Sequence, residues 1–130
     1  MNGYARARAA IIGLLPDLKG WKVYPDGIAT GAKPPWVVVS MSEDGRERSE
    51  GGRTTNHLGK LDIRVVSLSE LGIGIVCDKL TEALDGAHAD GVSALIADVD
   101  SGVYASELVD TDSSTPYLMR VLTWRTGWPA

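Results

Sequence analysis

The residues of this chain that could act as nucleophiles or proton carriers are few, and the sequence does not group them. It contains one cysteine, Cys77, and two histidines, His57 and His88. Cys77 falls in the apolar part of a predicted helix, where a thiol behaves as a small inert hydrophobe. Both histidines fall in polar segments that we expect to be loops, whereas nucleophilic catalysis needs a base positioned beside the nucleophile. The sequence therefore predicts no catalytic residue and no enzymatic activity.

Two short motifs resemble ligand sites only in part. Asp98-Val99-Asp100-Ser101-Gly102 starts like a calcium loop but lacks its further oxygen ligands and terminal Glu, so we interpret it as a turn between two strands. Gly72-Ile73-Gly74 lacks the third glycine of a dinucleotide fingerprint and opens no βαβ unit. No metal or cofactor is expected. Nothing in the sequence places the carboxylates of this region in one cleft, and we interpret them as a solvated acidic edge: Asp98, Asp100, Glu107, Asp110 and Asp112.

Residues 42–57 form the most polar segment of the chain. The segment has three glycines, no large apolar residue and charges of both signs, so it cannot bury itself. We expect a flexible arm that is either a long loop or an extended hairpin. As an ordinary surface loop the arm would have no partner; as a functional element it would order against a neighbouring subunit, with charge pairs that set register. The arm residues predicted to line such an interface are Arg46, Arg48, Glu50 and Arg53.

Composition limits the function classes. The chain has 130 residues, 44% of them hydrophobic, and a formal net charge of −4, which fits one globular domain over residues 1–130. The arginines of the arm alternate with carboxylates, so nucleic-acid binding is not expected as the main activity. One cysteine allows no intrachain disulfide, and no apolar run has the length of a membrane span or of a secretory signal. We expect synthesis in the cytoplasm and no membrane partner.

Apolar periodicity predicts an α+β fold: a mostly antiparallel sheet of about four to five strands, two helices packed on it and the long polar arm. One helix is predicted over Asn2–Leu15, and a second follows the capping-box pattern Ser67-Leu68-Ser69-Glu70 and runs to about Asp85. The strands are predicted over Trp36–Met41, Leu58–Leu68, Ser93–Asp98, Tyr104–Val109 and Pro116–Trp124, with Ser101-Gly102 as the turn between the third and fourth.

The strand at Trp36 is apolar on both faces. Trp36 and Val38 point one way, whereas Val37, Val39 and Met41 point the other way. Such a strand is either covered on both sides within the subunit or presents its second face to another subunit. Trp124 and Trp128 are further interface candidates because tryptophan often anchors interfaces. A place in the core is an equally good interpretation of Trp124.

The order of these segments resembles a known family. An amphipathic N-terminal helix leads to Val23-Tyr24-Pro25, the strand Pro34–Ser40 and the polar arm. The alternating strand Leu61–Val65, a helix that ends near Leu84-Asp85-Gly86 and a final Arg120–Trp124 strand follow. This pattern is similar, over nearly the whole chain, to the tail-terminator or tail-completion proteins of long-tailed phages and prophages.

The resemblance implies a structural protein of the virion without enzymatic activity or cofactor. It implies a ring, usually of six subunits, at the head-proximal end of the tail tube, where it stops tube elongation and joins the tail to the head. The implied partners are copies of the chain, the major tail tube protein and the head–tail connector protein, with DNA only as cargo passing through the lumen. The implied location is the virion tail, after assembly in the host cytoplasm. Two alternatives stay open: another head–tail joining or tail-tube-like protein, and a small-molecule or peptide-binding α+β module.

Overall fold

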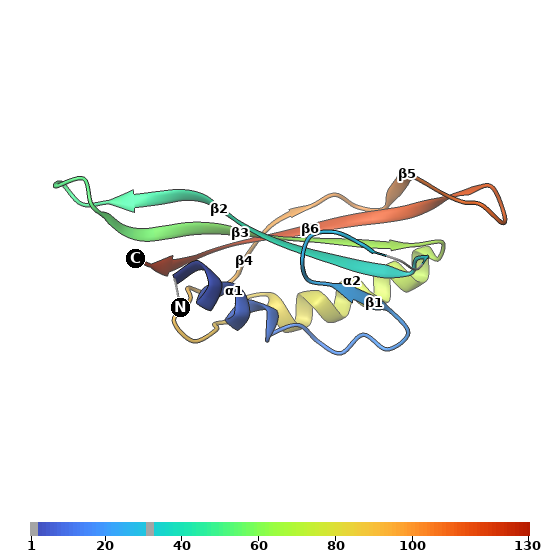
Figure 1. The fold of residues 1–130 in the computed structure, drawn as a ribbon. Helices are drawn as coiled ribbons and strands as arrows, with labels where there is room; N and C mark the ends of the chain where they lie inside the picture. The colour runs from blue at the N-terminus through green and yellow to red at the C-terminus, as the bar shows by residue number, and fades with distance from the viewer. Residues whose placement is uncertain (1–2, 31–32) are drawn as a thin grey trace.

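A computed structural model describes residues 3–30 and 33–130, in which two helices pack on one face of a six-stranded mixed sheet (Figure 1). The predicted α+β class is confirmed. In chain order the elements are α1 (Gly3–Ile12), β1 (Lys22–Tyr24), β2 (Trp36–Arg48), β3 (Thr54–Ser67), α2 (Glu70–Leu84), β4 (Ile96–Asp100), β5 (Tyr104–Asp110) and β6 (Thr115–Pro129).

The strand order is β1-β2-β3-β6-β4, and β5 also pairs with β6. The sheet has six strands, more than the predicted four to five, because Lys22–Tyr24 adds a short edge strand parallel to the start of β2. The other pairings are antiparallel, as predicted. The expected hairpin turn at Ser101-Gly102 is wrong: β4 and β5 do not pair with each other, because both lie along the same edge of β6.

The pairing of β3 with β6 runs without a register shift from Asn56 opposite Pro129 to Ser67 opposite Leu118. The β2–β3 hairpin therefore projects at one end of this ladder and the β5–β6 hairpin at the other. Figure 1 shows the two hairpin tips at opposite ends of the molecule, beyond the helices. The subunit is thus long in the strand direction, and each end carries a different loop.

The polar segment 42–57 is a hairpin, one of the two forms expected for it. β2 continues through it to Arg48, β3 starts at Thr54, and the Ser49 amide donates to the Arg53 carbonyl across the turn at 2.9 Å. The register shifts between Glu43 and Gly45 and again between Glu47 and Arg48. Such bulges bend a strand and increase its twist.

Alternation along the long strands sends every second side chain into one core beneath the sheet. There the apolar faces of the helices contact side chains from three strands: Trp128 and Trp124 of β6, Leu61 and Ile63 of β3, and Val37 and Val39 of β2. The fully buried side chains are Trp124, Trp128, Ile11, Leu61, Ile63, Ile73, Leu80, Leu84, Leu95, Val37, Val39 and Val65.

Helix α2 begins at Ser69, whose hydroxyl accepts a hydrogen bond from the Gly72 amide at 3.0 Å, so Ser69 and not Ser67 caps the helix. The Ser67 hydroxyl instead accepts from the Ser69 amide. Helix α1 ends at Ile12, short of the predicted Leu15, because Gly13–Leu15 form tight turns before Pro16. The predicted start at Asn2 lies outside the described residues.

Alanine substitutions at two glycines, Gly59 and Gly74, should change the stability of the fold in opposite directions. A Cβ on Gly59 would lie 2.3 Å from the buried Trp128 ring, whereas a Cβ on Gly74 of α2 would meet no atom within 4 Å. We expect Gly59→Ala to lower the free energy of unfolding by about 1–3 kcal/mol through overpacking. Gly74→Ala should raise it by about 0.5–1 kcal/mol, since alanine loses less backbone entropy in a helix.

Urea unfolding of both variants, followed by circular dichroism, measures the two effects. Equal stability of Gly59→Ala and the natural chain would contradict the close packing of Trp128 on β3.

Candidate functional site

The face of the sheet turned away from the helices carries a row of apolar side chains. Register places Trp36 of β2 opposite Val66 of β3, Val66 opposite Met119 of β6, and Met119 opposite Tyr104 of β5. Residues directly opposite each other share one face of the sheet, so these four side chains cross it as one row. We call this the apolar row. The strand that begins at Trp36 is predicted to have a second apolar face. In the structure that second face is apolar across four strands of the sheet.

A groove of about 720 Å³ lies along the apolar row. Its walls come from the loop at Gly27–Ala29 and from Tyr104–Leu108 of β5, and Arg64 and Glu107 are its charged lining residues. Ile28 on the rim is 69% exposed. Tyr24 packs edge-on against Trp36, one of the lining residues, with ring centroids 5.9 Å apart. An open, mostly apolar hollow of this kind suits contact with another molecule.

The root of the hairpin arm is held by stacked and hydrogen-bonded side chains. His57 stacks on Trp128 with ring centroids 5.7 Å apart, and Trp128 meets Tyr4 of α1 edge-on at 5.9 Å. The Glu43 carboxylate contacts Nδ1 of His57 and accepts from Nε of Arg46 at 2.8 Å. The hydrogen bond with His57, followed by that with Arg46, lowers the pKa of Glu43. These contacts therefore fix the base of the arm to the part of the sheet that is packed against the helices.

The predicted arm residues stand in two different settings. Arg46 is committed to Glu43 at the root of the arm. Arg48, Glu50 and Arg53 are exposed near the tip, and within residues 3–30 and 33–130 their side chains have no hydrogen-bond or ion-pair partner. The tip thus offers both signs of charge to a neighbour.

Trp124 and Trp128 lie inside the subunit, each with 2% of its surface exposed. The Trp124 indole donates from Nε1 to Oδ1 of Asp85 at 2.7 Å, which satisfies its one polar atom. Both side chains therefore have the core role, the alternative weighed for Trp124, and neither has surface left to line an interface between subunits.

The structure does not assemble the residues considered for nucleophilic chemistry. Cys77 is buried in α2, and burial raises the pKa of its thiol to about 11, so the thiol is protonated at neutral pH. His57 lies in strand β3 and not in a loop, with its ring on Trp128. His88 lies in the connection between α2 and β4. Among the described residues no group of three or more His, Cys, Asp or Glu side chains is arranged to hold a metal ion.

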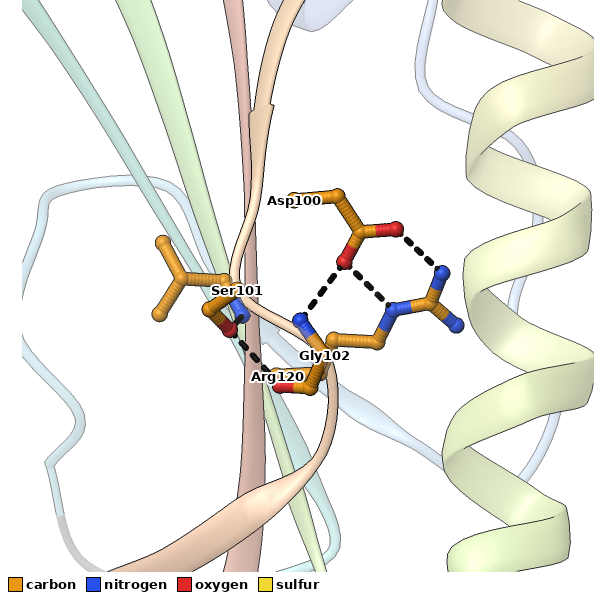
Figure 2. Close-up of polar contacts among 5 residues, drawn as sticks. Asp100, Ser101, Gly102 and Arg120 are labelled. Atoms are coloured by element: carbon orange, nitrogen blue, oxygen red, sulfur yellow. Dashed lines mark hydrogen bonds and ion pairs between the residues drawn. The ribbon is translucent and has the colours of Figure 1, made fainter.

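Asp100, Ser101 and Gly102 form a structural clamp on β6, and Figure 2 shows their contacts with Arg120 and the neighbouring backbone. The Asp100 carboxylate accepts from Nε and Nη2 of Arg120 at 2.9 and 2.6 Å and from the Gly102 amide at 3.0 Å. Ser101 closes the other side, since its hydroxyl accepts from the Val121 amide and its own amide donates to the Val121 carbonyl. The clamp fixes the point where the chain passes from β4 to β5.

The five acidic residues considered for acid–base chemistry have separate surroundings. Asp98 pairs with Arg125, Asp100 with Arg120, and Asp112 with Lys33. Asp110 accepts from the Ser113 hydroxyl in the β5–β6 turn, and Glu107 lines the groove. Sequence reasoning missed the pairing of Asp100 with Arg120, because no local pattern links residues twenty positions apart.

The clamp predicts a specific acid sensitivity. Hydrogen bonds from Arg120, followed by that from the Gly102 amide, lower the pKa of Asp100 from the ordinary 3.8 to about 2. A lowered pKa means that the ionised carboxylate stabilises the fold above about pH 4, and that this contribution disappears as the pH falls through about 2. Because the Asp100 side chain is 48% exposed, solvent screening reduces its size.

We therefore expect Asp100→Asn to lower the urea midpoint at pH 7, and the difference from the natural chain to shrink between pH 4 and 2. Asp90→Asn, which removes the same charge from an exposed loop, should leave the midpoint unchanged across this range. A difference for Asp100→Asn that stays constant down to pH 2 would contradict the clamp.

Comparison with protein-family models finds no family that matches this chain, and comparison with curated proteins finds no match. In the part of the chain that the structure describes, no helix is both long and apolar enough to cross a membrane.

Proposed function

We propose that this chain is a structural subunit of a phage tail: a tail terminator that forms a ring on the head-proximal end of the tail tube. The ring stops tube elongation and joins the tail to the head connector, and the subunit carries out no catalysis. The observation that carries the proposal is the combination of an apolar face beyond the subunit's own core with a charged hairpin projecting past it. Val66 in the apolar row is only 5% exposed, but Tyr104 at 42% and Ile28 at 69% leave apolar surface beside it, and exposed apolar patches mark interaction sites.

The two ends of the subunit support contacts of the head-to-tail type. The β2–β3 and β5–β6 hairpins differ in sequence and lie at opposite ends of the β3–β6 ladder. Contacts between two different surfaces of one chain generate a ring when the rotation between copies closes. The same surfaces would also suit another head–tail joining protein or a tail-tube-like protein. Microscopy of tail tubes distinguishes these roles, because only a tail terminator caps one tube end.

Sedimentation velocity and negative-stain microscopy of the concentrated chain, alone and with polymerised tail tubes of the same phage, test the proposal. We expect rings, and tubes capped at one end. A chain that stays monomeric and leaves tube ends bare would overturn it.

The second candidate is a small-molecule or peptide-binding module, and the groove at the apolar row is the observation that favours it. A ligand seated there stabilises the folded chain, so melting temperatures measured across a metabolite and peptide panel should rise for that ligand. Ring formation without any such rise favours the structural role.

The arm predicts a separation of folding from assembly. Deleting Glu47–Asn56 and joining Arg46 to His57 through Asn-Gly retains the contacts of Glu43 at the root, and Asn-Gly suits a two-residue hairpin. We expect an unchanged melting temperature and loss of ring formation or tube capping. The control is Ser49→Ala at the exposed tip, which keeps the arm length and all charges of the arm. Global unfolding of the shortened chain, or normal assembly by it, would contradict this role of the arm.

A further inference from the structure

A second apolar surface lies on the outer side of α2. Leu71 is 75% exposed and Ile75 is 50% exposed, although both belong to a helix whose opposite side is fully buried. They are four residues apart and therefore stand one above the other. Asp78 and Glu82 continue the same line at the helical spacing of three and four residues. This α2 stripe is thus apolar in its first half and acidic in its second.

The open face of the sheet has a matching order. The apolar row, with Val66 of β3, lies at one end. Two residues further along β3 comes Arg64, then Asp62, then Lys60, all on the same face by strand alternation. Arg64 is 54% exposed, and its contact with Asp62 is loose, at 3.9 Å. Along β3 the face is therefore apolar at one end and carries two cations around one carboxylate along the rest of its length, and Arg125 of β6, paired with Asp98, lies opposite Lys60.

The two surfaces run in the same direction along the molecule. Helix α2 starts beside Arg120, which borders the same shallow hollow as Leu71, and it ends at Asp85, which accepts from Trp124. On both surfaces the side chains therefore change from apolar to charged in the direction from the apolar row toward the hairpin arm. The lengths agree as well, since Leu71 to Glu82 spans about 16 Å of helix and Val66 to Lys60 about 20 Å of strand.

We propose that the α2 stripe of one copy docks on the open sheet face of a second copy of this chain. Because the surfaces lie on opposite sides of the sheet and share one direction, two copies stacked in nearly parallel orientation place Leu71 and Ile75 on the apolar row. The same stacking brings Asp78 and Glu82 to Arg64 and Lys60. The chain itself therefore supplies the complementary apolar and charged partner of its groove. This inference rests on the proposed function, since it names the contact that repeats around the ring.

The proposed contact joins two different surfaces of the chain, so each surface can be disrupted separately. In the stripe variant, Leu71→Asp with Ile75→Asp, the face stays intact. In the face variant, Arg64→Glu with Tyr104→Asp, the stripe stays intact. Each variant alone should sediment as a monomer, and their mixture should give a one-to-one dimer and nothing larger, because only one complementary pair of surfaces remains. All substituted side chains are partly exposed, and circular dichroism checks that each variant folds.

The natural chain and Val99→Asp, an exposed position on β4 that lines neither the groove nor the α2 stripe, are the controls and should self-associate alike. The inference is overturned if the variants associate like the natural chain, if their mixture stays monomeric, or if the natural chain is monomeric at about 1 mM, where even a millimolar contact is half occupied. Capping of tail tubes by the natural chain is read separately, so the proposed function can stand while this contact fails.

Discussion

The antiparallel pairing of β3 with β6 is the constraint on which the rest of the subunit depends. Its twelve consecutive residue pairs run without a shift, so alternation stays in phase along both strands. On one face this phase delivers Leu61, Ile63, Leu122 and Trp124 to the core with the helices. On the other face it aligns Val66 with Met119. A slip of one residue would exchange the two faces and expose the core.

The elements with a strong apolar period were predictable from the sequence. The alternation of Leu61, Ile63 and Val65 gave β3, and the spacing of Ile73, Val76 and Leu80 gave the buried side of α2. The exposed stripe on α2 was missed because the core stripe already accounts for the helical period, although the same spacing sets Leu71 and Ile75 on the opposite side of the helix. The two apolar faces predicted for the strand Trp36–Met41 correspond to the core on one side of the sheet and the apolar row on the other.

The arm and the last strands show what local patterns cannot supply. Arg46 and Thr55 lie in strands only because their neighbours across the hairpin pair with them, and a polar segment without alternation carries no strand signal. The places of β4 and β5 on one edge of β6 are non-local pairings. The role of Trp128 is also non-local, since a bulky indole reaches the core only where Gly59 leaves room for it.

The two bulges of the arm, at Asp44 in β2 and at Thr55 in β3, have a consequence for how this chain avoids unwanted growth. Beyond Val39 no strand among residues 3–30 and 33–130 lies beside the outer edge of β2, so its backbone could template a foreign strand. The extra residue Asp44 breaks the even spacing of amides and carbonyls along that edge, and the extra residue Thr55 of β3 increases the twist of the hairpin. Exposed charged side chains such as Arg48 also keep this edge hydrated and disfavour its pairing with another strand. The arm is thereby a poor seed for fibrils, although it is one of the longest ribbons in the molecule.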